Sequence, residues 1–144
     1  MTRVDCPLCG GDGGEVLWRD KFCRVIWVED ADYPGFCRVI LNQHVREMTD
    51  LPAAERRHLM DVVFATEAVV RTLLEPAKIN LASLGNMVPH LHWHVIPRFS
   101  DDRHFPDAIW AQPRRETAVR RELAPDFKQQ CAALLRQRLG PPRG

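Results

Sequence analysis

The chain has 144 residues, which is the length of one ordinary domain, long enough for a substantial core and too short for two. Its 20 lysines and arginines against 19 acidic residues leave a formal net charge of +1, which excludes broad electrostatic attraction to nucleic acid or to an anionic membrane. No apolar stretch approaches the length of a membrane span, and residues 1–5 lack the apolar segment of a secretory signal, so we expect a cytoplasmic protein.

The first motif is a Cys-x-x-Cys pair, Cys6 and Cys9, followed by four glycines within residues 10–14. Glycines let a backbone turn tightly around a bound ion, whereas a redox-active pair would be followed by a helix, which glycines disfavour. Two thiolates supply only half of a tetrahedral zinc site, and the six histidines of the chain are the candidates for the remainder. Five cysteines, an odd number, favour reduced thiols over a disulfide framework.

Three segments rich in β-branched and aromatic residues come next, at 15–19, 22–28 and 36–41. The polar pair Asp20-Lys21 predicts a hairpin between the first two, and the acids, proline and glycine of residues 29–35 predict a loop before the third. An antiparallel meander on one side of a core is the simplest arrangement of these strands.

A long amphipathic helix is predicted after the third strand. Asp50, Pro52 and Glu55 are typical of a helix start, and Pro76 ends the pattern. Residues on one face recur at three- and four-residue steps, at Leu59, Val62, Val63, Thr66, Val69, Val70, Leu73 and Leu74. Charged residues occupy the opposite face, where we expect His58 to be exposed.

Two further strands are predicted, at 78–84 and 90–98, joined by a turn at 85–89. Alternate side chains of a strand project to the same face, so His90, His92 and His94 share one surface, while the apolar residues between them pack on a core. Three clustered imidazoles are costly as a purely structural feature, because each needs hydrogen-bond partners and repels its neighbours when protonated. The cluster therefore favours a metal site or histidine catalysis.

The run His90-Leu91-His92-Trp93-His94-Val95-Ile96 resembles the pattern His-φ-His-φ-His-φ-φ, in which φ is hydrophobic, of the histidine triad superfamily of nucleotide hydrolases and transferases. Residues 78–80 and 85–89 are similar to the asparagine-bearing strand and the phosphate-contacting loop of that family. The resemblance runs from about Cys6 to Phe99. It implies an α+β fold of the histidine triad (HIT) type, with an antiparallel sheet of about five strands, one long amphipathic helix packed on it, and C-terminal helices.

The expected domain organisation follows from the same resemblance. Residues 1–112 form a HIT domain, which includes an N-terminal zinc knuckle at 6–14 and the triad strand at 90–98, and residues 113–144 form a C-terminal helical extension. We expect two helices at 116–123 and 126–139.

The resemblance also implies a structural zinc ion. Residues 38–40, leading to His44, are similar to the strand before the zinc-binding histidine of galactose-1-phosphate uridylyltransferase and of zinc-bearing triad proteins. In those relatives a Cys-x-x-Cys pair, this histidine and the first triad histidine hold the ion. Carried over, the ligands are Cys6, Cys9, His44 and His90. The alternatives are that His44 is a surface histidine at a strand end and that the cysteine pair binds nothing.

The same resemblance implies a catalytic role for the other triad residues. His92 attacks the α-phosphate of a nucleotide and forms a nucleotidyl-histidine intermediate, and His94 binds phosphate oxygens or protonates the leaving group. Neutral imidazole is a competent nucleophile near pH 7 when its other nitrogen is hydrogen-bonded. Asn80 and Asn86 are expected to contact substrate, although Asn86 can also be read as a plain turn residue. Phe36 stands where some branches have an additional histidine.

Residues 100–110 form a polar loop with aromatic residues, in which we expect His104 to face solvent. Phe105 and Trp110 either stack on a nucleotide base or fill the edge of the core.

The implied substrate is a nucleotide conjugate of the dinucleoside polyphosphate or nucleoside phosphoramidate type, and the implied assembly is a homodimer, with neither nucleic acid nor membrane as partner. Two alternatives stay open. The protein is a non-catalytic nucleotide-binding or regulatory protein, or His90, His92 and His94 themselves form a metal site.

Overall fold

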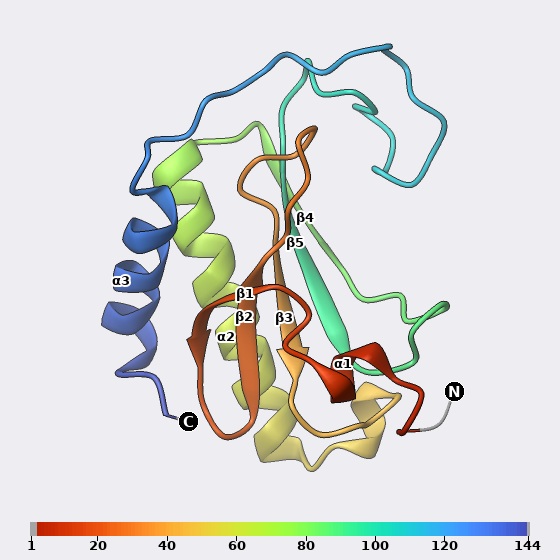
Figure 1. Cartoon of the computed structure of the whole chain (residues 1–144), viewed down its shortest axis with the longest axis vertical. Helices are drawn as coiled ribbons and strands as arrows, with labels where there is room; N and C mark the ends of the chain where they lie inside the picture. Colours follow the sequence, from red (N-terminus) through yellow and green to blue (C-terminus); the bar gives the residue numbers. More distant parts are fainter. Residues whose placement is uncertain (1–2, 144) are drawn as a thin grey trace.

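The computed structural model describes residues 3–143 and shows one antiparallel sheet with its two longer helices on one face (Figure 1). The five strands are β1 (Glu15–Arg19), β2 (Cys23–Trp27), β3 (Cys37–Leu41), β4 (Lys78–Ala82) and β5 (His92–Arg98), in the order β1-β2-β3-β5-β4. The helices are α1 (Pro7–Gly10), α2 (Ala53–Leu74) and α3 (Phe127–Leu139), with a short 3-10 helix at Met48–Asp50. The predicted α+β architecture, an antiparallel sheet of five strands with one long helix packed on it, is confirmed.

One face of the sheet forms the main core, because alternate strand residues carry branched apolar side chains to the same side. Val25, Val39 and Val95 are fully buried there against the apolar stripe of α2, which includes Leu59 and Val62. Helix α3 packs beside α2 and against β1. The amphipathic helix predicted from periodicity therefore lies where its pattern requires.

Helix α2 ends as the sequence predicts. Glu75 takes the left-handed conformation with φ 48° and donates its backbone N–H to the carbonyl of Arg71, and Pro76 follows. No helix within residues 3–143 combines the length and the apolar composition needed to cross a bilayer.

The opposite face of the sheet is covered from two ends. The knuckle around α1 covers one end, where Gly13, with φ 87°, lies so close to Ile40 that an added Cβ would come within 2.8 Å of its side chain. A segment after β5 covers the other end, where Ile109 packs on Tyr33, Phe36 and Ile96. In Figure 1 this segment crosses the top of the molecule before α3.

Three local expectations are wrong. Residues 116–123 are irregular, so the C-terminal part has one helix, α3, and not two. His104 is buried, only 7% exposed, because its ring bonds to the hydroxyl of Tyr33. His58 is half-buried and its Nε2 lies 2.6 Å from a carboxylate oxygen of Asp20, so α2 is tied to the β1–β2 turn.

The triad strand is shorter than predicted. β5 begins at His92, whereas His90 precedes it, and the N–H of Leu91 donates to the carbonyl of Val45 in a loop. The ring of His90 therefore need not follow the alternation that places His92 and His94 together.

Candidate functional site

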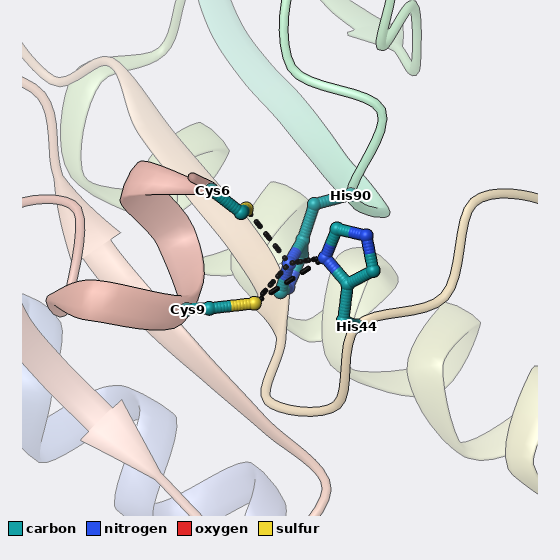
Figure 2. Close-up of side chains that lie close together, drawn as sticks. All are labelled: Cys6, Cys9, His44 and His90. Carbon is teal, nitrogen blue, oxygen red and sulfur yellow. Dashed lines mark hydrogen bonds between the residues drawn. The ribbon is translucent and has the colours of Figure 1, made fainter. Parts of the chain in front are cut away.

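Four side chains from three parts of the chain meet beside the start of β5 (Figure 2). Cys6 directly precedes α1 and Cys9 lies within its single turn, His44 lies in the loop after β3, and His90 precedes β5. Their possible ligand atoms all lie within 4.8 Å of one another. The structure thus brings together the four residues predicted from the resemblance as metal ligands, in a cluster that can hold a metal ion.

The separations within this cluster suit a tetrahedral ion. Nδ1 of His90 lies 3.4 Å from Sγ of Cys6, 3.5 Å from Sγ of Cys9 and 3.3 Å from Nδ1 of His44. Zinc bonds of about 2.3 Å to sulfur and about 2.0–2.1 Å to nitrogen would place S and N about 3.6 Å apart and two nitrogens about 3.3 Å apart. The residues present therefore fit a Cys2His2 zinc site.

Hydrogen bonds orient this cluster. Nε2 of His90 lies 2.6 Å from the carbonyl of Leu41, and because a carbonyl only accepts, the proton sits on Nε2 and leaves the Nδ1 lone pair free for a metal. Arg24 is 5% exposed and donates to the carbonyls of Leu8, Gly11 and Asp12 in the knuckle. The sequence does not reveal this role of Arg24, because its partners in the knuckle are backbone carbonyls.

His92 is half-buried on the face opposite α2, and its Nδ1 lies 2.6 Å from the carbonyl oxygen of His90. The ring must donate from Nδ1, so Nε2 carries the lone pair that a nucleophile needs. The rings of His92 and His94 lie 5.1 Å apart, whereas His90 turns its Nδ1 to the cysteines. Within residues 3–143 neither His92 nor His94 belongs to a group of possible metal ligands, which argues against a metal site made by the three triad residues.

His94 is 5% exposed and is surrounded by three side chains. Nε of Arg38, its cross-strand partner on β3, donates to its Nδ1 at 3.2 Å, and the rings of Phe36 and Trp110 lie 5.8 and 5.0 Å away. Burial first, and then the charges of Arg38 and His92, lower the pKa of His94 to about 4. His94 is therefore neutral at pH 7.

The two predicted substrate-binding asparagines lie in different places. Asn80, on β4, accepts a hydrogen bond of 2.7 Å from Nη1 of Arg98 through its side-chain oxygen. Asn86 is exposed in the turn and borders a hollow with Arg46 and Glu47, apart from the rings of His92 and His94. Among the residues that the structure describes, neither asparagine side chain forms a hydrogen bond with a triad ring.

Ser83 forms a direct hydrogen bond to a triad residue. Its hydroxyl donates to the carbonyl of His92 at 2.9 Å. It also borders, with His92 and Trp93, a cavity of about 260 Å³. The sequence signal for Ser83 was only its place at the end of the predicted strand 78–84, and a serine there has no distinguishing pattern.

The segment that carries Trp110 is fixed by a buried ion pair. Arg98 donates to both carboxylate oxygens of Asp102 at 2.7 and 3.0 Å, and the carboxylate also accepts the backbone N–H groups of Phe99, His104 and Phe105. Burial alone would raise the pKa of Asp102, but these hydrogen bonds, led by that of Arg98, lower it to about 2. The loop over the triad face is thus anchored at both pH 7 and mildly acidic pH.

Comparison with known proteins places the chain among relatives. Residues 13–101, more than half of the chain, match the HIT domain. The chain is 26% identical over 136 residues to a protein of Mycobacterium tuberculosis named AP-4-A phosphorylase, across 88% of this chain and 70% of that protein. It is 26% identical over 105 residues to the asymmetrical bis(5'-nucleosyl)-tetraphosphatase of Schizosaccharomyces pombe, across 69% of this chain and 58% of that protein.

Solved structures agree on the fold. A histidine triad protein from Marinobacter aquaeolei VT8 matches with a TM-score of 0.72 and 26% identity, over 88% of this chain and 92% of that one. A Zn-bound histidine triad family protein from Mycobacterium smegmatis matches with a TM-score of 0.63 and 21% identity, over 94% and 96%, and at that identity shows the fold alone. The domain match confirms the resemblance carried by the histidine motif: this chain belongs to the HIT family.

Proposed function

We propose that this protein is a zinc-bearing nucleotide hydrolase or transferase that breaks the bond at the α-phosphate of a nucleotide conjugate through a nucleotidyl-His92 intermediate. The observation that carries the proposal is the hydrogen bond of 2.6 Å from Nδ1 of His92 to the carbonyl of His90, which fixes Nε2 as the nucleophilic nitrogen. The names of the two curated relatives support conjugates of the dinucleoside polyphosphate type.

In the proposed first step, Nε2 of His92 attacks the α-phosphorus, a new N–P bond forms, and the bond from phosphorus to the leaving group breaks. The imidazole then carries a positive charge, which the carbonyl of His90 stabilises through the Nδ1–H group. In the second step, water or another acceptor attacks the same phosphorus, the N–P bond breaks, and neutral His92 is restored. The proton of the attacking water leaves to solvent.

Zinc would be held by Cys6, Cys9, His44 and His90, a complete set of four protein ligands. Such a site would supply structural support and no open coordination position. Its support reaches the nucleophile through His90, whose ring belongs to the cluster and whose carbonyl accepts from His92. The four ligand atoms within 4.8 Å of one another support this assignment of the metal.

We also propose a homodimer in the cytoplasm as the working form. None of the five cysteines forms a disulfide among the described residues, as a reducing compartment favours. Light scattering on the purified protein tests the assembly, and a monomeric mass at micromolar concentration would contradict it.

The decisive test is mass spectrometry of the protein quenched with acid-free denaturant after mixing with diadenosine tetraphosphate. We expect a nucleotidyl adduct on the peptide that contains His92, and loss of both adduct and turnover in His92→Ala. Nucleotide binding, measured by calorimetry with AMP, should persist in that variant. Turnover that survives in His92→Ala overturns the proposed enzyme, and binding without any turnover of the wild-type protein would instead identify a nucleotide-binding or regulatory protein.

A further inference from the structure

The register between β3 and β5 places an arginine directly opposite the last triad histidine. Arg38 pairs with His94 across the two strands, and its Nε lies 3.2 Å from Nδ1 of His94. Cross-strand partners project to the same face, so both side chains lie on the triad face. Arg38 is half-buried, because Phe36 and the sheet cover part of it.

This contact fixes the proton position on His94. A guanidinium can only donate, so Nδ1 of His94 must be the acceptor and its single proton must sit on Nε2. A second proton on Nδ1 would break the hydrogen bond and place two cations in contact. Burial opposes that charge as well, in agreement with the lowered pKa of His94.

Arg38 also supplies a positive charge beside His94, which the neighbouring aromatic rings cannot supply. Phe36 stands 5.8 Å from the ring of His94, and Trp110 stands on it too, but neither ring can carry a charge. The titratable or charged groups that face His94 are Arg38 from β3 and His92 from β5. The carboxylate of Asp30 also acts electrostatically on Arg38 and favours its charged form.

The consequence concerns the leaving group. When the α-phosphorus is bonded to a polyphosphate oxygen, the leaving group departs as a stable anion and needs no proton, only positive charge and N–H donors. When it is bonded to an amine nitrogen, the P–N bond breaks readily only if nitrogen receives a proton, which a cationic imidazole could give. To give that proton, neutral His94 would have to become an imidazolate, which is very unfavourable. Arg38 cannot give it either, because a guanidinium does not release its proton at neutral pH.

We propose that Arg38 is a positioning residue that keeps His94 as the neutral Nε2–H tautomer, and that this arrangement makes the site selective for phosphoanhydride bonds over phosphoramidate bonds. The inference deepens the proposed function and rests on it.

The test compares two probes, diadenosine tetraphosphate and adenosine 5'-phosphoramidate, on the wild-type protein, Arg38→Gln and Arg38→Lys. For the wild type we expect kcat/KM on the tetraphosphate to exceed that on the phosphoramidate by about 100-fold or more, the contribution of one general acid. Arg38→Gln should lower kcat on the tetraphosphate by about 100-fold with little change in KM, and Arg38→Lys should recover part of the loss. Arg57→Gln, at an exposed position of α2, is the matched control and should leave both substrates unaffected.

A spectroscopic measurement separates positioning from a structural role. Nitrogen-15 NMR of histidine-labelled wild-type protein should show His94 protonated on Nε2 from pH 5.5 to 8, and Arg38→Gln should show a mixture of tautomers. Should Arg38→Gln fail to fold, the wild-type spectrum still decides, because a proton on Nδ1 of His94 overturns the proposal.

The kinetic outcomes distinguish the two levels of the claim. If His92→Ala is inactive but the wild type cleaves the phosphoramidate as fast as the tetraphosphate, the inference about Arg38 fails and the proposed function stands. If His92→Ala keeps full activity on both probes, the proposed function fails first. An unchanged kcat in a folded Arg38→Gln also overturns the inference.

Discussion

The carbonyl of His90 accepts a hydrogen bond from Nδ1 of His92 at 2.6 Å, while the ring of the same His90 lies in the Cys6, Cys9 and His44 cluster. One residue therefore connects the candidate metal site to the candidate nucleophile through two different groups. Any disturbance of the cluster that rotates the His90 backbone changes the proton position on His92.

Replacing Cys9 with serine should remove the metal and weaken the fold. The binding free energy of a structural zinc ion contributes to folding, so we expect a loss of about 3 kcal/mol, or a fall in Tm of about 10 °C. Elemental analysis of metal content and thermal unfolding check this. Cys131→Ala, a buried thiol on α3 outside the cluster, is the control and should keep the full metal content. Wild-type protein that purifies without zinc would contradict the prediction.

His94 should make stability depend on pH in a defined window. Its pKa falls from 6.5 to about 4 on folding, so below pH 6.5 the unfolded chain binds a proton that the folded chain refuses. The stabilisation is complete above pH 6.5 and is lost as the pH falls towards 4, by at most about 3 kcal/mol. Urea unfolding at pH 7 and pH 4.5 should show a smaller difference for His94→Gln than for the wild type. An equal difference in both proteins would refute the assignment.

Replacing Asp102 with asparagine should destabilise the loop over the triad face. Arg98 is 2% exposed, and without the carboxylate it becomes a buried cation with no counter-charge, at a cost of about 3–5 kcal/mol. Urea unfolding at pH 7 measures the loss. Asp107→Asn removes an exposed ion pair with Arg114 and serves as the control, with little expected change. An equal loss of unfolding free energy in the two variants would show that the buried Arg98–Asp102 pair contributes no more to stability than the exposed pair.

Trp110 distinguishes base stacking from filling of the core edge. Its side chain is 51% exposed although its ring lies 5.0 Å from that of His94, which suits a partner for a nucleotide base. We expect Trp110→Ala to raise KM for diadenosine tetraphosphate about 10-fold, with kcat nearly unchanged, and Trp110→Phe to recover most of the affinity. A fall in Tm with unchanged KM would support the filling role instead.

The parts of the fold that agree with the sequence are those with a strong local signal. α2 agrees to within a residue or two, because the three- and four-residue steps report burial directly. β1, predicted from its β-branched and aromatic residues, agrees as well. The helix predicted at 116–123 is wrong because that segment buries too little apolar surface. Val119 and Leu123 lie four residues apart, but Val119 is 54% exposed, and a helix of eight residues that buries so little apolar surface is not stable alone.

In the site, the residues of recognisable motifs could be predicted from the sequence, whereas the residues that contact them could not. The four clustered residues could be identified by resemblance because cysteine and histidine are distinctive. Arg38 and Ser83 could not, since their roles depend on strand register and on a backbone carbonyl. His104 was placed in solvent because its neighbours are polar, yet Asp102 turns the chain so that His104 meets Tyr33, a residue 71 positions earlier.

The cluster also has a topological consequence. A metal ion that joins Cys6 to His90 would close a loop across 84 positions, and a cross-link over so long a separation restricts the unfolded chain strongly. The ion would then tie the knuckle at residues 6–14 to His90, two residues before the proposed nucleophile His92, although the two are far apart in the sequence. Fusion partners or labels are therefore better attached beyond α3 than ahead of Cys6.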